Sequence, residues 1–282
     1  MISIYKVFNK ILNNKNISCS KADVYTILSH ILKKDYQWIA SNLDYNLSDH
    51  QLTQLEKILN LLETNYPLAY ITKSKYFYKH NFYVDKNVLI PRIESEQIID
   101  LVYDFVKNNN NLTITDLCTG SGCLGITLAL LNSLNNVLLI DIDDNALNIA
   151  RKNLKKFNLH NIRVLKSNFI KVLIDQSIKS NVLVCNPPYI DANDQTLSEN
   201  VKLYEPNIAL FASDRGLYFY KKLINNIDKI MDLDQNFIIV LEFGWNQKKI
   251  IEEILKDNCL KYNWEFKRDH YGNWRNLVIK NF

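Results

Sequence analysis

The sequence has 282 residues, 47% of them hydrophobic, and a formal net charge of +4 at neutral pH. This length and apolar content allow one large and one smaller domain, each with its own core, and they exclude a disordered chain. No run of about 18 apolar residues marks a membrane span, and the first residues lack a secretory signal. We therefore expect a cytoplasmic protein that makes no membrane contact.

The cysteines and the basic residues exclude further classes of protein. The five cysteines form no CxxC pair, so neither a disulfide framework nor a metal site is expected. The Lys and Arg residues form no dense block of the kind that follows a phosphate backbone. Charge therefore does not indicate direct binding of nucleic acid.

The first part of the chain has helical periodicity. From Tyr5 to about Tyr66 the apolar residues recur three or four positions apart. Ser48, followed three residues later by Gln51, predicts a capping box at the start of the last helix. We predict an all-helical domain over residues 1–66.

A connecting hairpin is predicted over residues 67–90. Pro67 ends the helical pattern, and the aromatic-rich run 70–84 has the composition of strands. Polar breaks near residues 73–75 and 79–81 divide this run. The pattern indicates short strands joined by turns.

Strands then alternate with helices from residue 91 to residue 282. Alternation of this kind predicts an α/β domain with a doubly wound, mostly parallel sheet. Residues 263–268 and 275–279 flank a turn at residues 270–273 and are predicted to form a strand pair. The expected strands are 112–117, 136–142, 162–166, 181–185, 237–243, 263–268 and 275–279.

A glycine loop follows the first of these strands. Gly120, Gly122 and Gly125 satisfy G-x-G-x-x-G, and Asp141 follows by about the 20 residues typical of a ribose-binding acid. The motif indicates an adenosine-containing ligand without separating NAD from S-adenosylmethionine. Asp116, within the strand, would repel a pyrophosphate but attract the ammonium group of a methionine moiety.

The fourth strand ends abruptly at Asn186-Pro187-Pro188-Tyr189. Both prolines lack an N–H and fix φ, and Pro187 restricts Asn186 to extended backbone. The Asn186 side-chain oxygen and the Pro187 carbonyl can accept both N–H donors of one planar NH2 group, while Tyr189 supplies a flat wall. This tetrapeptide favours methyl transfer from S-adenosylmethionine to an amide or amino nitrogen, although Asn-Pro-Pro is also a common strand-terminating turn.

With these motifs the chain resembles, over nearly its whole length, the protein-(glutamine-N5) methyltransferases that modify peptide chain release factors. The Ile-Pro-Arg and Glu-Pro elements make this resemblance specific, since Asn-Pro-Pro-Tyr also occurs in adenine-N6 methyltransferases. The matching elements are Pro67–Ile71, Leu89–Glu96, the glycine loop, Asn186–Ile190, Tyr204–Pro206, Ala209–Leu210, Glu242–Trp245 and Tyr271–Asn273.

The resemblance implies a fold, a substrate and a cofactor. It implies a Rossmann-like class I methyltransferase domain with a mostly parallel seven-stranded sheet, and a helical N-terminal domain that docks the release factor. The substrate is then the glutamine in the Gly-Gly-Gln loop of class I release factors, with S-adenosylmethionine as methyl donor. We expect a monomer.

Family roles carry over to particular residues. The resemblance assigns cofactor contacts to Cys118, Thr119, Gly120, Ser121, Gly122, Asp141, Phe169 and Asn186, and the glutamine clamp to Asn186, Pro187, Pro188 and Tyr189, of which Asn186, Pro187 and Tyr189 are assigned to catalysis. Two departures stand out: Cys118 replaces the usual first glycine, and Asn168-Phe169 replaces Asp-Trp. Phe169 can still pack on an adenine face, but Asn168 supplies no charged acceptor to its amine.

Several assignments stay open at this point. Arg92, Glu94 and Glu96 either line the cleft or reflect the preference of helix starts for acids, and Glu205 either orders a substrate loop or caps a turn. Competing functions are N6-adenine methylation of DNA or RNA, NAD-dependent oxidoreduction, and a cofactor-binding module without activity.

Overall fold

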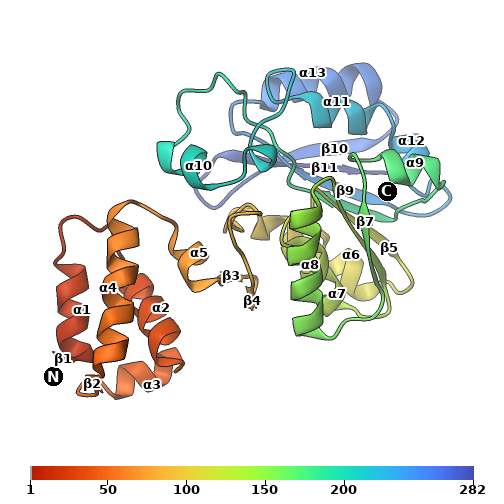
Figure 1. Cartoon of the computed structure of the whole chain (residues 1–282). Coiled ribbons are helices and arrows are strands. Elements are labelled where there is room, and N and C mark those ends of the chain that lie inside the picture. Colours follow the sequence, from red (N-terminus) through yellow and green to blue (C-terminus); the bar gives the residue numbers. More distant parts are fainter. Residues whose placement is uncertain (1) are drawn as a thin grey trace. The chain divides into compact units, whose positions relative to one another are not determined.

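The computed structural model describes residues 2–282, which form two compact units, one ending at Ser74 and the other running from Lys75 to Phe282 (Figure 1). Five helices build the first unit. Their apolar faces enclose one core, to which α1, α2, α3 and α4 all contribute buried residues. The helices are α1 (Ile4–Leu12), α2 (Lys21–Leu32), α3 (Tyr36–Ser41), α4 (Asp49–Glu63) and α5 (Leu68–Thr72).

Polar side chains define where these helices begin. Ser48 accepts the N–H of Gln51, and the Gln51 side chain accepts the N–H of Ser48 at 2.9 Å, which confirms the predicted capping box. Ser20 and Asp23 form a second box at α2. Each satisfies backbone donors that have no partner within the helix.

Two features of this region differ from the sequence prediction. The first unit is not entirely helical, because β1 (Ile2–Ser3) pairs antiparallel with β2 (Asn46–Leu47), where Leu47 is buried. The prediction of strand over residues 70–72 was wrong, since these residues belong to helix α5. Pro67 has a φ of −61°, which suits the residue before a helix, so a helix starts there and buries Tyr70.

The predicted hairpin is shorter than expected and belongs to the second unit. Strand β3 (Lys75–Phe77) pairs with β4 (His80–Phe82), with Phe77 opposite His80. Phe77 and Phe82 are both fully buried, and their rings meet edge to face. These aromatic side chains join the core beneath the large sheet, so packing holds the hairpin there.

Seven strands form the sheet of the second unit, as the resemblance implies. Their order is β10-β11-β9-β8-β5-β6-β7, and the five strands from β9 to β7 are parallel. Strand β11 runs antiparallel to both of its neighbours, β9 and β10. The strands are β5 (Thr113–Leu117), β6 (Asn136–Asp141), β7 (Ile162–Lys166), β8 (Val182–Cys185), β9 (Ile238–Glu242), β10 (Asn263–Arg268) and β11 (Trp274–Lys280).

Helices cover both faces of this sheet (Figure 1). On β8, Val182 and Val184 face one core while Leu183 and Cys185 face the other, because successive side chains of a strand alternate. One face carries α6 (Glu96–Asn108), α7 (Cys123–Leu131) and α8 (Asp144–Phe157), and the other carries α9 (Lys171–Asp175), α11 (Tyr218–Ile224), α12 (Ile227–Ile230) and α13 (Lys248–Asn258). The connection after β8 contains α10 (Glu199–Tyr204) and the short 3-10 helix η1 (Asn207–Ala209).

The strand order creates a crevice beside β5. From β5 the chain proceeds outward to β6 and β7, and then returns to β8 on the other side of β5. The connections that leave the carboxyl ends of β5 and β8 therefore diverge, and open α/β sheets bind ligands at such a switch point. The glycine loop and Asn186–Tyr189 follow these two strands directly.

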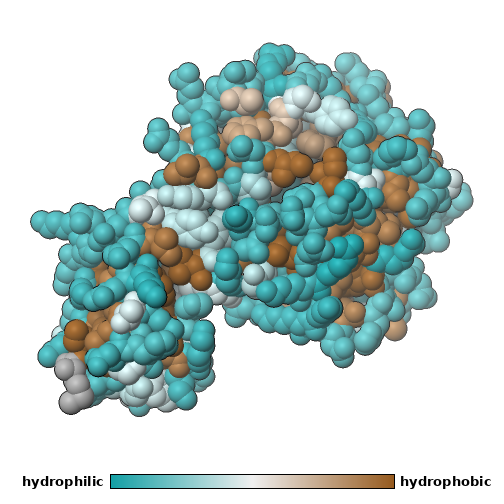
Figure 2. Space-filling model, in the orientation of Figure 1, coloured by the Kyte–Doolittle hydropathy of each residue, from teal (hydrophilic) through white to brown (hydrophobic). Residues whose placement is uncertain are grey.

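The surfaces of both units are predominantly hydrophilic in the view of Figure 2, with apolar side chains gathered in smaller patches. Within residues 2–282, none of the helices combines the length and apolarity that crossing a bilayer requires.

Gly125 tests how tightly α7 packs on the sheet. A Cβ at this position would lie 2.3 Å from Leu139 Cδ2 and 3.0 Å from Asp116 Cβ. We expect Gly125→Ala to lower the free energy of unfolding by about 1–3 kcal/mol through overpacking, measured by urea denaturation. Gly244→Ala is the matched control, because its Cβ would lie 3.1 Å or more from its three nearest atoms, all of them in the side chains of Asn246 and Gln247. Equal losses in the two variants would contradict this account of α7.

Candidate active site

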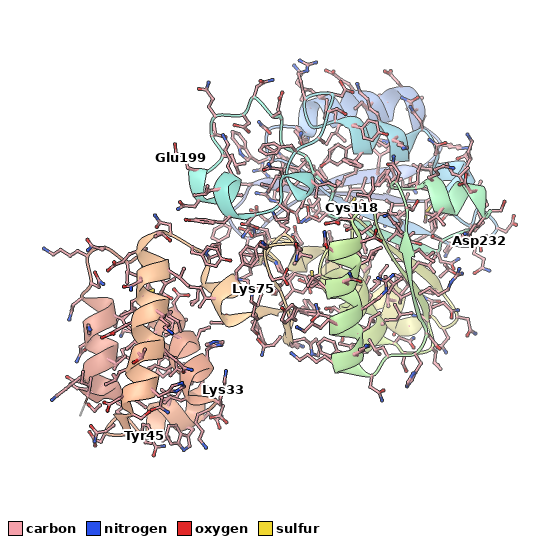
Figure 3. All side chains as sticks on the ribbon, in the orientation of Figure 1. Lys33, Tyr45, Lys75, Cys118, Glu199 and Asp232 are labelled. Atoms are coloured by element: carbon pink, nitrogen blue, oxygen red, sulfur yellow. The ribbon has the colours of Figure 1, made fainter. Side chains whose placement is uncertain are left out.

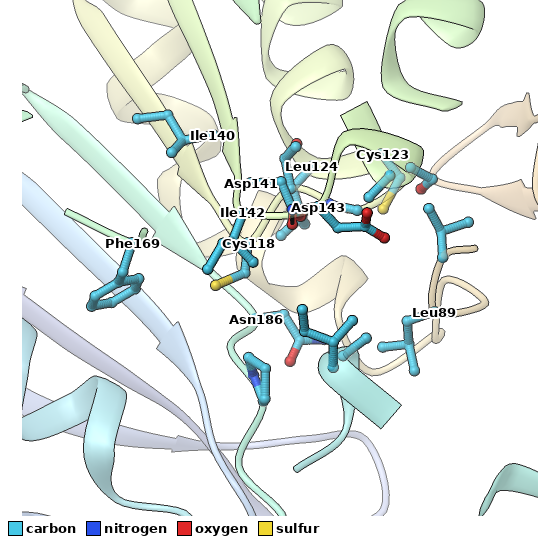
Figure 4. A pocket seen from close by; sticks show the side chains of 18 of the residues that line it. Leu89, Cys118, Cys123, Leu124, Ile140, Asp141, Ile142, Asp143, Phe169 and Asn186 are labelled. Atoms are coloured by element: carbon cyan, nitrogen blue, oxygen red, sulfur yellow. Dashed lines mark hydrogen bonds between the residues drawn. The ribbon is translucent and has the colours of Figure 1, made fainter. Parts of the chain in front are cut away.

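One pocket lies at the carboxyl ends of the parallel strands and collects most of the predicted site residues. Figure 4 shows Cys118, Asp141, Phe169 and Asn186 around it, each from a different strand end. The predicted residues on its wall are Cys118, Thr119, Gly120, Ser121, Asp141, Phe169, Asn186 and Pro188. Gly122, Pro187 and Tyr189 do not line it, although each adjoins a residue that does.

The glycine loop turns through left-handed backbone. Cys118, Gly120 and Gly122 have φ values of +56°, +52° and +82°. Glycine adopts this conformation without penalty, whereas a side chain there costs on the order of 1 kcal/mol. Cys118 therefore holds a strained backbone, and its side chain lies at the pocket in the interior of the second unit (Figures 3 and 4).

Asp116 supports the loop from inside β5. Its Oδ2 accepts the hydroxyl of Thr119 at 2.6 Å and the N–H of Gly125 at 2.9 Å. The other oxygen, Oδ1, is buried without a hydrogen-bond partner in the described part of the chain. Burial raises the pKa of this carboxyl to about 7, and the two hydrogen bonds oppose that rise. Thr119, which donates to Oδ2, lines the pocket, whereas Asp116 itself does not.

Asp141 ends β6 and is held by backbone donors. Its Oδ2 accepts the N–H of Gly120 at 2.9 Å, and its Oδ1 accepts the N–H of Asp143 at 3.1 Å. The first bond ties the end of β6 to the glycine loop. A carboxylate in this position keeps free lone pairs that can accept hydroxyl protons from a ligand.

Phe169 forms the apolar side of the pocket. Its side chain is only 4% exposed and packs edge to face on Phe219 with ring centroids 4.9 Å apart. Its φ of +55° reflects a sharp turn after β7, in which the Phe169 N–H donates to the carbonyl of Ser167. Asn168 also lines the pocket, so both departures from the family pattern, at Cys118 and at Asn168-Phe169, border the same pocket.

Asn186 follows the fully buried strand β8 and is half buried itself. Its Nδ2 donates to Ser95 Oγ at 3.0 Å, and Ser95 Oγ donates to Glu242 Oε2 at 2.5 Å. Tyr189 reaches the same carboxylate, with its hydroxyl 3.4 Å from Glu242 Oε1. Burial and the Glu242 charge raise the pKa of Tyr189, so this hydroxyl stays protonated at neutral pH.

The acidic residues whose roles the sequence did not decide lie in different parts of the second unit. Glu205 is buried, accepts the N–H of Ile90 at 3.0 Å and forms an ion pair with Arg92, which lines the pocket. It thereby joins the Ile-Pro-Arg segment to the connection after β8. Glu96 accepts the N–H of Tyr78 in the hairpin, and neither Glu94 nor Glu96 is on the pocket wall.

Sequence reasoning gave no role to Ser95 or Glu242, although both residues fall in the matching segments. Ser95 is one of several polar residues before a helix, and such residues are usually caps. The sequence offered one sign that Glu242 has a role. It directly follows four apolar residues of a strand, and a carboxylate buried in such a place is usually paired with hydrogen-bond donors.

Asp116 also predicts how stability depends on pH. Its pKa of about 7 in the folded chain exceeds the unfolded value of about 3.9, so the folded state binds more protons between these values. This contribution to stability is therefore lost as pH rises. We expect the wild type to lose about 2–3 kcal/mol relative to Asp116→Asn between pH 5 and pH 7, measured by urea denaturation. Parallel pH profiles of the two proteins would rule out this assignment.

Two family models match the chain, one over each unit. Residues 4–72 match the PrmC N-terminal domain, and residues 99–205 match the Methyltransferase small domain.

Solved structures are similar in fold. The catalytic domain of hMettl16 has a TM-score of 0.57 at 18% identity, covering 88% of this chain and 93% of that one. A methyltransferase from Pyrococcus furiosus has a TM-score of 0.53 at 16% identity, covering 83% and 99%. These structures establish the class I methyltransferase fold.

Closer similarity comes from curated relatives. The release factor glutamine methyltransferase of Mycoplasma mycoides subsp. mycoides SC is 62% identical over 280 residues, which cover 99% of both chains. That of Clostridium botulinum is 32% identical over 253 residues, covering 89% of each. Since the identity extends through both units, the chain belongs to the S-adenosylmethionine-dependent release factor glutamine methyltransferases.

Proposed function

We propose that this protein transfers a methyl group from S-adenosylmethionine to the N5 amide nitrogen of the glutamine in the Gly-Gly-Gln motif of class I release factors. The observation that carries the proposal is the position of Asn186. Its amide shares one pocket with the glycine loop and Asp141, at the switch point between β5 and β8. The relatives named for release factor glutamine methylation support the choice of substrate.

The residues on the pocket wall suit the cofactor. Asp141 offers acceptors for ribose hydroxyls, Phe169 offers an apolar face for adenine, and the loop from Cys118 to Gly122 allows close backbone approach. Asp116 does not line the pocket, so its carboxyl group would act on the methionine end of the cofactor through the glycine loop that it holds, not by direct contact. When bound, S-adenosylmethionine supplies a methyl group activated by its sulfonium charge.

The chain's own task is then to position a weak nucleophile. An amide nitrogen shares its lone pair with the carbonyl, so orientation matters more than acid–base chemistry. In our proposal Asn186 Oδ1 and the Pro187 carbonyl accept the two N–H hydrogens, Pro188 stiffens the turn and Tyr189 limits the side of the site. Holding reactants in a reactive geometry is worth up to roughly 7–11 kcal/mol.

The remaining assignments follow from this function. We propose that the first unit, which ends at Ser74, docks the release factor and that the second unit, Lys75 to Phe282, carries out methyl transfer. The protein would act as a cytoplasmic monomer on a protein substrate. Neither nucleic acid nor a membrane is a partner in this proposal.

The direct test uses labelled S-adenosylmethionine and a purified class I release factor. We expect label in the wild-type factor and none in a variant of the factor with Ala in place of the Gly-Gly-Gln glutamine. Equal labelling of the two factors would refute glutamine as the acceptor. Methylation of DNA or RNA alone would instead support the adenine-N6 alternative.

Asn186→Ala separates catalysis from folding. The variant removes the side-chain acceptor, so we expect the turnover number to fall by about 100-fold or more while the thermal midpoint stays within a few degrees. A control with Asn193→Ala, an exposed position in the following loop, should keep full turnover. Retained turnover in Asn186→Ala would exclude the proposed clamp.

Cys118 predicts a gain in cofactor affinity. Glycine accepts the φ of +56° and removes the side chain that limits approach to the loop backbone, so Cys118→Gly should bind S-adenosylmethionine about fivefold more tightly, by isothermal titration calorimetry. Cys118→Ala is the control, because it removes the sulfur but keeps the strained backbone. Weaker or unchanged binding in Cys118→Gly would show that the family's glycine is dispensable here.

A further inference from the structure

Ser95 lies at a junction of polar groups from three separate elements. Ser95 precedes α6, Asn186 follows β8, and Glu242 is the last residue of β9. Ser95 Oγ is 3.0 Å from Asn186 Nδ2 and 2.5 Å from Glu242 Oε2. Ser95 is 3% exposed and Glu242 is 2% exposed, so water does not compete strongly for these bonds.

Counting protons decides which way the Asn186 amide points. Ser95 Oγ donates its single hydroxyl hydrogen to Glu242 Oε2, the direction required when the Glu242 carboxylate is ionised and can only accept. Ser95 Oγ can then only accept, and the group that faces it must be the NH2 of Asn186. The amide oxygen of Asn186 is therefore directed away from Ser95.

We propose that Ser95 and Glu242 are positioning residues that hold the Asn186 amide with its oxygen presented to the substrate. This inference deepens the proposed function and rests on it for the identity of the substrate. A reversed amide would direct its NH2 at the NH2 of glutamine, and two donors cannot bond. The same orientation selects an amide over a carboxylate, because a carboxylate has no hydrogen to give to the Asn186 oxygen.

This order depends on the ionisation state of Glu242. Burial raises the pKa of Glu242, but the Ser95 hydroxyl, the charge of Arg275 on β11 and the Tyr189 hydroxyl oppose the rise, while Glu94 adds to it. A neutral group at position 242 could donate to Ser95, and Ser95 could then donate to a reversed Asn186 amide. While Glu242 is ionised, the hydrogen bonds can run only from Asn186 to Ser95 and from Ser95 to Glu242.

The kinetic test compares four variants at saturating cofactor. We expect Ser95→Ala and Glu242→Gln to lower kcat for release factor methylation about tenfold, or about 1.4 kcal/mol, with the Kd of the cofactor changed less than about threefold. Ser95→Thr retains the hydroxyl and should restore kcat to within about threefold of the wild type. Ser180→Ala removes an equally buried hydroxyl, bonded to Thr115 away from the pocket, and should leave kcat unchanged.

A second measurement needs no substrate. Selective 15N labelling of asparagine, with Asn186→Asp to identify the signal, allows the nuclear Overhauser effect between the Asn186 NH2 and the Ser95 Hβ protons to be observed. We expect this effect in the wild type and its weakening in Glu242→Gln. Its absence in the wild type would overturn the inference, as would full kcat in Ser95→Ala or equal loss in Ser180→Ala. A wild type that shows the effect but methylates no release factor would refute the proposed function and leave the amide orientation standing.

Discussion

The parallel pairing of β5 with β8 is the constraint on which the rest of the site depends. Leu117 lies opposite Cys185 in this register, so the residues that follow, Cys118 and Asn186, emerge side by side at the same edge of the sheet. The chain leaves β5 toward β6 and leaves β8 toward β9, so the connections diverge and leave room for a ligand. A shift of two residues in this pairing would move Asn186 by about 7 Å along the sheet.

Around this edge, buried acidic side chains form hydrogen bonds with loop residues that lie outside the sheet. Asp116 secures the glycine loop, Glu205 joins two segments far apart in sequence, and Glu242 aligns Ser95. A buried carboxylate is stable only where donors satisfy it, so each acid restricts its neighbouring loop to one arrangement. Rigid positioning suits a reaction in which orientation of the acceptor nitrogen is the main requirement.

Local sequence patterns predicted most of the strands, and they failed where tertiary packing determines the secondary structure. Strands β7 and β10 match their predicted bounds, because polar residues alternate with apolar or aromatic ones over a length typical of strands. Residues 70–72 were mispredicted as strand, since Tyr70 and Ile71 have strand propensity while the helix start after Pro67 and burial of Tyr70 favour α5. The roles of Ser95 and Glu242 were not predicted, because they lie 147 positions apart.

By itself the sequence determined the α/β alternation, the glycine loop with Asp141 and the stiff turn at Asn186–Tyr189, because each depends on backbone restrictions and spacings within a short segment. It also determined family membership, through elements distributed along the whole chain. Only the tertiary structure decided which of these residues share a pocket, which way the Asn186 amide points and which acids are buried. Those properties depend on contacts between strands and helices far apart in sequence, and no local pattern encodes them.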